Sequence, residues 1–169
     1  MKKIFFILGI FLSWTIVSNS QVISKFEFSI TWGVMSRNSY NSKTKEFQKD
    51  LVLDVYRGKL KLTRKQMKSI LQKINEINFW GIPERYTGTR PPPVNGEYQL
   101  GPSITPNSHY SISVNLNGKS HSVAWSMESI DMGEKGRFNE LNSLYKYIGS
   151  IISSSKEWKN APPMQGGYR

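Results

Sequence analysis

The stretch from Tyr110 to Trp125, YSISVNLNGKSHSVAW, decides the fold that we predict. Apolar residues alternate with polar ones on both sides of Asn117-Gly118, a pair that favours a two-residue type I′ turn. This turn pairs residue 110 with 125, 112 with 123, 114 with 121 and 116 with 119, so the apolar residues all fall on one face. We therefore predict an antiparallel hairpin with one buried face. His121 belongs to that face and His109 to the opposite one.

Two further strands and a short third one are expected before this hairpin. Residues 26–32 alternate between bulky apolar and polar side chains, as a half-buried strand does. Residues 35–46 are polar and rich in turn formers, so we expect a loop there. The apolar residues of 50–56 alternate again and predict a second strand. Arg57-Gly58 is then expected to turn the chain into a short strand over 59–62, with Leu60 and Leu62 inward.

Two amphipathic helices complete the pattern. Thr63 and Gln66 form the spacing of a capping box, and an apolar stripe runs from Met67 to Ile77 until Gly81 and Pro83 stop it. These features predict a helix over 64–78. A second apolar stripe predicts a helix over 134–153.

Together these elements predict one α+β domain over residues 21–157. Each helix has one apolar stripe and each strand pair one apolar face. This favours an antiparallel sheet of about four strands with two helices packed on one face. The predicted order is strand, strand, helix, loop, strand, strand, helix. Residues 84–107 hold five of the eight prolines and are expected to form a long loop, and residues 158–169 a flexible Pro/Gly-rich tail.

The first twenty residues have the pattern of a secretory signal peptide. A positive start, Met1-Lys2-Lys3, precedes an apolar run over 4–17, and small residues at 18 and 20 favour cleavage before Gln21. The run is short for a membrane span, which needs roughly 20 apolar residues, although a retained anchor is the alternative. We therefore expect export to the periplasm or beyond the cell. The chain has no cysteine, so disulfides, thiolate metal sites and lipid attachment through cysteine are excluded.

The same segments resemble a group of exported proteins of Gram-negative bacteria whose function is unknown. The shared features are a helix start at Leu62–Gln66, a helix end at Asn78–Pro83 and the turn Asn117–Lys119. The layout is more distantly similar to emfourin, a small inhibitor of thermolysin-type metalloproteases. The resemblance spans roughly residues 22–155 and implies the same α+β fold. It maps no inhibitory residue onto this chain.

The sequence contains no motif typical of an enzyme or a metalloprotein. The two histidines are expected on opposite faces of the hairpin, and the Ser-x-x-Lys strings at Ser143 and Ser153 lack the partner motifs of penicillin-recognising enzymes. There is no nucleophile elbow and no phosphate-binding glycine loop. We therefore predict a protein that is not an enzyme, with no catalytic, cofactor-binding or metal-binding residues and no cofactor.

Two groups of residues are candidates for binding. The chain carries a formal net charge of +11, of which the predicted signal contributes two. One candidate is a basic cluster where the second strand region meets the first helix; the alternative is a solvated basic face. The other is a set of loop residues that would contact a protein; the alternative is a loop that merely covers the domain. The basic cluster comprises Lys59, Lys61, Arg64, Lys65 and Lys68, and the loop set comprises Tyr86, Arg90 and Tyr98.

These observations favour an exported, non-enzymatic binding or envelope-associated domain. The partner would be another protein or an anionic envelope component. Nucleic acid is not expected, because the strand aromatics alternate onto the apolar face instead of forming exposed stacking platforms. An inhibitor of a metalloprotease is the alternative function. No transmembrane segment is expected after the signal is cleaved.

Overall fold

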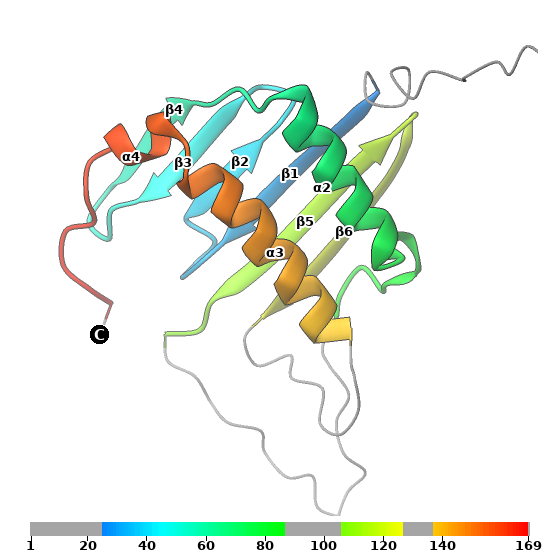
Figure 1. The fold of residues 1–169 in the computed structure, drawn as a ribbon. Coiled ribbons are helices and arrows are strands. Elements are labelled where there is room, and N and C mark those ends of the chain that lie inside the picture. The colour runs from blue at the N-terminus through cyan, green and yellow to red at the C-terminus, as the bar shows by residue number, and fades with distance from the viewer. Residues whose placement is uncertain (1–24, 87–105, 127–136, 169) are drawn as a thin grey trace, which may run out of the picture.

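The computed structural model describes residues 25–86, 106–126 and 137–168. The predicted signal peptide over 1–20 and most of the predicted loop over 84–107, including Arg90 and Tyr98, lie outside the described residues. Six antiparallel strands form one sheet in the order β4-β3-β2-β1-β5-β6 (Figure 1). The strands are β1 (Phe26–Trp32), β2 (Asn38–Asn41), β3 (Glu46–Asp50), β4 (Val55–Lys59), β5 (His109–Leu116) and β6 (Lys119–Ser126).

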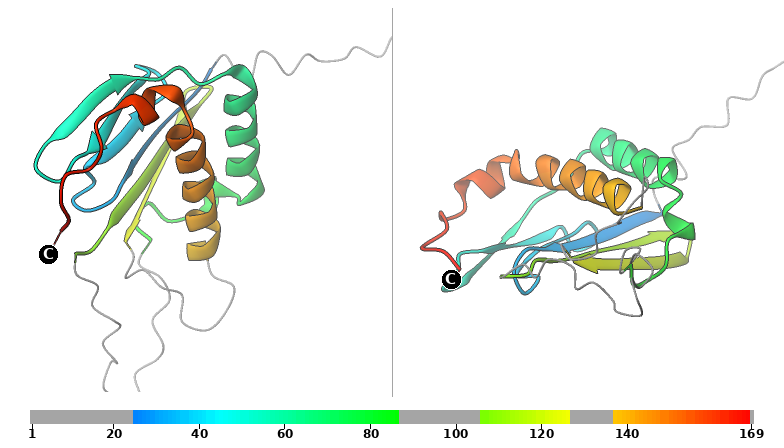
Figure 2. Two further views of the ribbon diagram at one scale, coloured as in Figure 1. Left: turned by 60° about the vertical axis from the view of Figure 1, so that its left-hand side comes forward. Right: turned by 90° about the horizontal axis from the view of Figure 1, so that it is seen from below.

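Both long helices lie on the same face of this sheet (Figure 2). They are α2 (Arg64–Glu76) and α3 (Arg137–Ser153), and a short 3-10 turn η1 (Phe79–Gly81) and a short helix α4 (Lys156–Asn160) follow them. The predicted α+β class is therefore confirmed, with a sheet that is larger than the four strands expected. Within the described ranges, no helix is long and apolar enough to cross a membrane.

The hairpin formed by β5 and β6 has the predicted register. Tyr110 pairs with Trp125, Ile112 with Val123, Val114 with His121 and Leu116 with Lys119. Ile112 and Val123 are completely buried beneath the helices. The prediction placed His121 on this face and His109 on the other. A ring nitrogen of His121 is hydrogen-bonded with the backbone oxygen of Ile82, whereas the side chain of His109 is exposed.

The sequence prediction was wrong for most of residues 35–62, although Leu60 and Leu62 are buried as expected. The expected loop over 35–46 contains β2 and the start of β3, because Tyr40 and Phe47 each supply one buried aromatic side chain to an otherwise polar strand. Residues 51–54, expected in a strand, connect β3 to β4, and the side chain of Leu53 is 81% exposed. Arg57 and Gly58 lie inside β4 and form no turn.

The start of α2 is as predicted. Thr63 has extended backbone angles, its hydroxyl accepts from the Gln66 amide, and the Gln66 side chain accepts from the Thr63 amide. This reciprocal pair is the capping box. Ile70, Leu71 and Ile74 form the buried stripe of α2, and α2 ends at Glu76, two residues before the predicted end.

The C-terminal segment returns to the sheet after α3. The predicted boundary of the tail at residue 158 falls inside α4, where Trp158 stacks on Trp32 and packs against Phe47. Further along, the Tyr168 hydroxyl donates to the carboxylate of Asp50, a side chain that is only 2% exposed. Arg37 forms an ion pair with the same carboxylate at 3.5 Å.

Candidate functional site

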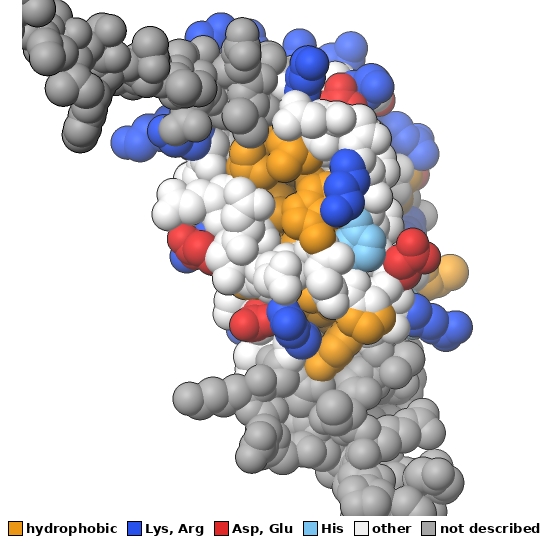
Figure 3. Space-filling view, turned by 90° about the vertical axis from the view of Figure 1, so that its right-hand side faces the viewer, with side chains coloured by type: hydrophobic (Ala, Val, Ile, Leu, Met, Phe, Trp, Pro, Cys, Tyr) orange, Lys and Arg blue, Asp and Glu red, His pale blue; other side chains and the backbone are white. Residues whose placement is uncertain are grey.

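The antiparallel topology gathers basic residues at one end of the sheet. β1, β3 and β6 begin at this end, while β2, β4 and β5 finish there, followed by the start of α2 (Figure 1). Figure 3 shows Lys and Arg side chains gathered at the corresponding upper end of the face on the β6 side. We call this region the basic end. It comprises Lys25, Lys43, Lys45, Lys59, Lys61, Arg64, Lys65, Lys68 and Lys119.

All five residues of the predicted basic cluster are exposed and belong to the basic end. Lys59 closes β4, Lys61 lies in the connection to α2, and the other three lie on the first turns of α2. None of the five takes part in an ion pair among the described residues. The first turn of α2 also carries no acidic residue. Cations at the start of a helix oppose its macrodipole, so this arrangement favours an anion from outside the chain.

Four further cations of the basic end were missed from the sequence. Lys45 lies beside the end of β4, where its carbonyl accepts from the Leu60 amide at 2.8 Å. Lys43 is in the same turn and lies 3.4 Å from Glu27, while Glu46 pairs across the sheet with Lys59. Lys25 precedes β1, and Lys119 is the first residue of β6. No sequence signal joined Lys43 and Lys45 to the cluster, because residues 35–46 were interpreted as a loop. Lys25 and Lys119 are brought to the basic end by the pairing of β1 with β5 and of β5 with β6.

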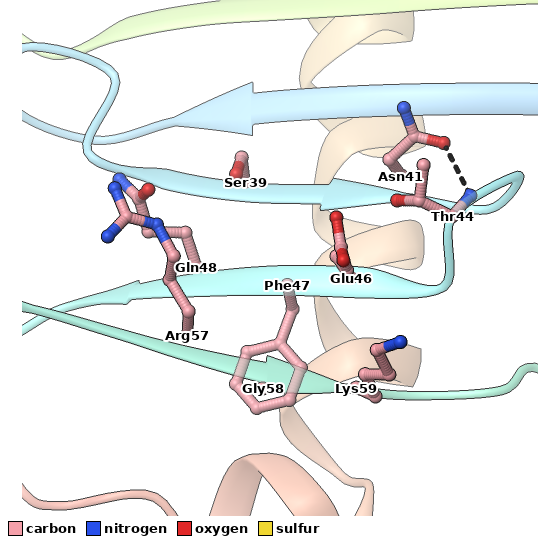
Figure 4. Close-up of a pocket in the computed structure, with 9 residues that line it drawn as sticks. All are labelled: Ser39, Asn41, Thr44, Glu46, Phe47, Gln48, Arg57, Gly58 and Lys59. Atoms are coloured by element: carbon pink, nitrogen blue, oxygen red, sulfur yellow. Dashed lines mark hydrogen bonds between the residues drawn. The ribbon is translucent and has the colours of Figure 1, made fainter.

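A hollow of about 410 Å³ lies over β2, β3 and β4, next to the basic end (Figure 4). Apart from Thr44 in the β2–β3 turn, its polar side chains come from alternate residues of the three strands, and Lys59 connects it to the basic end. The side chain of Asn41 caps the β2–β3 turn by accepting from the amides of Lys43 and Thr44. The residues that line the hollow are Ser39, Asn41, Thr44, Glu46, Phe47, Gln48, Arg57, Gly58 and Lys59.

The sheet face away from the helices is covered with short polar side chains. The registers align these side chains in rows that run across the strands. Hydroxyl pairs connect neighbouring strands: Thr31 with Ser111 at 2.8 Å and Ser122 with Ser113 at 2.7 Å. We call this surface the polar face. It comprises Ser29, Thr31, Ser39, Asn41, Ser111, Ser113, Asn115, Ser120 and Ser122.

Of the predicted loop residues, only Tyr86 lies within the described part of the chain. Its amide donates to the carbonyl of Ala124 at 2.8 Å, and the Ala124 amide donates to the carbonyl of Glu84. Residues 84–86 therefore extend along the outer edge of β6, with Tyr86 packed against the core. Arg90 and Tyr98 lie outside the described residues, so the predicted loop contact stays a prediction.

The histidine and acidic side chains of residues 25–86, 106–126 and 137–168 are scattered. No group of three or more His, Asp or Glu side chains lies close enough there to hold a metal ion. The described acidic residue with the deepest burial, Asp50, is held by Arg37, Tyr168 and the Val52 amide, and so has a structural role. The surface features with the clearest chemistry are thus the basic end and the polar face.

Comparison with known proteins adds no family assignment. No protein-family model matches the chain, and no curated protein matches it. The resemblance to exported proteins and to emfourin therefore stays a prediction, carried by the helix cap, helix end and hairpin turn.

Proposed function

We propose that this protein is a non-enzymatic, envelope-associated binding domain that docks through its basic end onto an anionic membrane surface. The observation that carries the proposal is the gathering of nine cations from five parts of the chain at one end of the sheet. Among the described residues, Glu27 and Glu46 are the acidic side chains that accompany them. In a basic cluster, each Lys or Arg that lies near an anionic lipid surface contributes about 1 kcal/mol to the free energy of binding.

The position of Lys25 favours a membrane partner if the predicted apolar run is retained as an anchor. The Lys25 carbonyl accepts from the Asn117 amide at the basic end. The predicted apolar run ends at residue 17, and the eight residues from there to Lys25 span no more than about 29 Å when extended. If the apolar run is retained as an anchor, the basic end is held near the lipid headgroups. If it is cleaved, docking depends on the cations alone.

Vesicle binding by the chain from Gln21 onward tests this proposal. We expect it to sediment with vesicles that contain phosphatidylglycerol and not with phosphatidylcholine vesicles, and binding should fall as salt rises because exposed charges are screened. The triple variant Lys61→Glu, Arg64→Glu and Lys65→Glu should lose most of this binding.

A matched control separates position from net charge. Lys146, Lys156 and Lys159 are exposed on α3 and α4, outside the basic end, and their replacement by Glu changes the net charge by the same amount. We expect the control triple variant to keep most of its vesicle binding. Equal losses in the two triple variants would overturn docking through the basic end. Binding to an anionic polysaccharide but to no vesicle would overturn the membrane assignment.

Inhibition of a metalloprotease, the alternative from the sequence, is not supported by any contact of the described residues. It stays a prediction that an inhibition assay against a thermolysin-type protease tests directly.

A further inference from the structure

The two edges of the sheet differ in what covers them. Along β6, the Tyr86 amide donates to the carbonyl of Ala124, and the Ala124 amide donates to the carbonyl of Glu84, so residues 84–86 run parallel to this strand and cover it. At the other edge, β4 is the outermost strand (Figure 1). Within the described part of the chain, no segment pairs with the outer side of β4. The chain therefore covers one edge of its sheet and leaves the other open.

The open edge of β4 presents the backbone groups of alternate residues. Leu60, directly after β4, donates its amide to the carbonyl of Lys45 on the β3 side. In an antiparallel pair, a residue directs its N–H and C=O to the same side, and the next residue directs both to the other side. The N–H and C=O groups of Val55, Arg57 and Lys59 therefore point outward, away from β3.

Most of these outward groups are available to another strand. The Val55 amide donates to the side chain of Asp54 at 2.7 Å. The amides of Arg57 and Lys59 and the carbonyls of Val55, Arg57 and Lys59 form no hydrogen bond with the described residues. A row of unpaired N–H and C=O groups along an edge strand is a template on which another strand can pair.

The side chains along this edge are apolar on one side and basic on the other. Leu53, just before β4, is 81% exposed, and Tyr56 is 37% exposed and packs on the helix side of the sheet. Arg57 and Lys59 both line the hollow over β2, β3 and β4 on the other side (Figure 4). Lys59 lies opposite Glu46, whereas Arg57 lies opposite a neutral residue and forms no ion pair among the described residues. This edge therefore favours a strand with an acidic residue opposite Arg57.

A second copy of the chain fits the open edge less well. If two copies of β4 paired antiparallel over their full length, Arg57 would face Arg57 of the other copy. Like charges directly opposite each other on neighbouring strands are destabilising. Charge complementarity therefore favours an acidic strand over the β4 strand of a second copy.

We propose that β4 binds an extended acidic segment of another protein, which adds to the sheet as a further strand. An acidic side chain of the segment lies opposite Arg57, and the apolar residues on either side of it pack on the helix side, beside Tyr56. Main-chain hydrogen bonds with Arg57 and Lys59 supply affinity, and the alternation of acidic and apolar residues supplies specificity. Lys59 also belongs to the basic end, but Arg57 does not, so variants of Arg57 separate this site from membrane docking.

Short peptides in which Glu and Val alternate test the proposal, with peptides in which Lys and Val alternate for comparison. The readout is the amide signals of Arg57 and Lys59 in proton–nitrogen NMR. We expect the acidic peptide to shift both signals and to slow the exchange of both amides with solvent, and the basic peptide to bind about tenfold more weakly or less. N-methylation of the Glu residues, whose amides face β4 in this geometry, should abolish binding. N-methylation of the Val residues should preserve it.

Two variants and a matched control complete the test. Arg57→Glu should weaken binding of the acidic peptide about tenfold, or about 1.4 kcal/mol. Arg57→Pro removes an outward amide and leaves the hydrogen bonds to β3 in place, since proline is tolerated on an edge strand where its N–H would face solvent, and it should bind no peptide. Arg85→Glu makes the same charge change beside the covered edge at β6 and should bind normally. Both Arg57 variants should keep most of their binding to anionic vesicles, so either proposal can fail without the other.

The measurements also distinguish the other occupants of this edge. Slow exchange of the Arg57 and Lys59 amides in the free protein would mean that the edge is already covered, and would overturn the proposal. A dimer in sedimentation experiments that Arg57→Pro converts to a monomer would assign the edge to a second copy. Equal binding of acidic and basic peptides, the same affinity in Arg57→Glu, or no shift with any peptide (an edge that stays in water) would each overturn the acidic partner.

Discussion

At the scale of single residues, Tyr40 is buried in a way that changes its acid–base chemistry. It is 1% exposed beneath the helices, its hydroxyl donates to the Leu60 carbonyl, and burial raises its pKa to about 12. Since the unfolded value is about 10, the folded state holds this proton more tightly, and stability falls as the pH rises through the interval from 10 to 12. The slope from this residue is at most about 1.4 kcal/mol per pH unit.

The variant Tyr40→Phe isolates that contribution. We expect urea unfolding at pH 9 and pH 11 to show a smaller loss of stability in the variant than in the parent chain, because lysine titration affects both alike. An identical pH dependence in the two proteins would contradict the raised pKa of Tyr40.

Single residues also show where the sequence failed to predict the structure. Gly58 was interpreted as a turn residue, yet a Cβ atom there would lie 2.6 Å from the ring of Phe47 in the neighbouring strand. The glycine is therefore needed for close packing, a requirement that depends on a residue eleven positions away. The open edge of β4 had no sequence signal either, because the pairing of a strand is a property of the tertiary structure. The cations from Lys59 to Lys68, in contrast, could be identified from their spacing alone.

At the scale of elements, the predictions that held depend on local chemistry. The capping box of α2 and the β5–β6 turn each involve residues within a few positions of one another, and both are as predicted. β2 and β3 could not be predicted in the same way, since each has so few apolar residues that its pairing partners decide its structure.

The cap makes a measurable contribution to α2. In Thr63→Ala the acceptor for the Gln66 amide is lost, and we expect the free energy of unfolding to fall by about 1 kcal/mol. Thr63→Ser keeps the acceptor and should retain most of the stability. Chemical denaturation of the three proteins measures the difference, and an alanine variant as stable as the serine variant would contradict the capping role.

The Tyr168 hydroxyl is one of the contacts that hold the C-terminal segment against the sheet. Tyr168→Phe removes the donor to the buried Asp50 carboxylate, and we expect a loss of about 1–2 kcal/mol, since hydrogen bonds to charged groups are among the stronger ones. Tyr56→Phe is the control, because the Tyr56 side chain packs on Phe47 and has no described hydrogen bond. The two variants are compared by urea unfolding. Equal stability would contradict a structural role for the Tyr168 contact.

At the scale of the whole molecule, the alternation of strand directions explains the basic end. It collects the cations of the basic end from segments that are far apart in the sequence. If the basic end is a binding surface, it lowers the stability of α2. An acidic residue in the first turn of a helix stabilises that helix by about 0.3–1 kcal/mol. The first turn of α2 has no acidic residue.

The charge-reversed triple variant at Lys61, Arg64 and Lys65 should therefore change stability and binding in opposite directions. Glutamates near the start of α2 satisfy the macrodipole and relieve repulsion among neighbouring cations, so we expect the melting temperature to rise by a few degrees at low salt, and by less at high salt. Vesicle binding should be lost in the same protein. The control triple variant on α3 and α4 should show a smaller rise, because the gain from Lys156→Glu in the first turn of α4 is offset by the loss from Lys159→Glu in its last turn. A variant that loses binding together with stability would instead indicate that the basic residues support the fold.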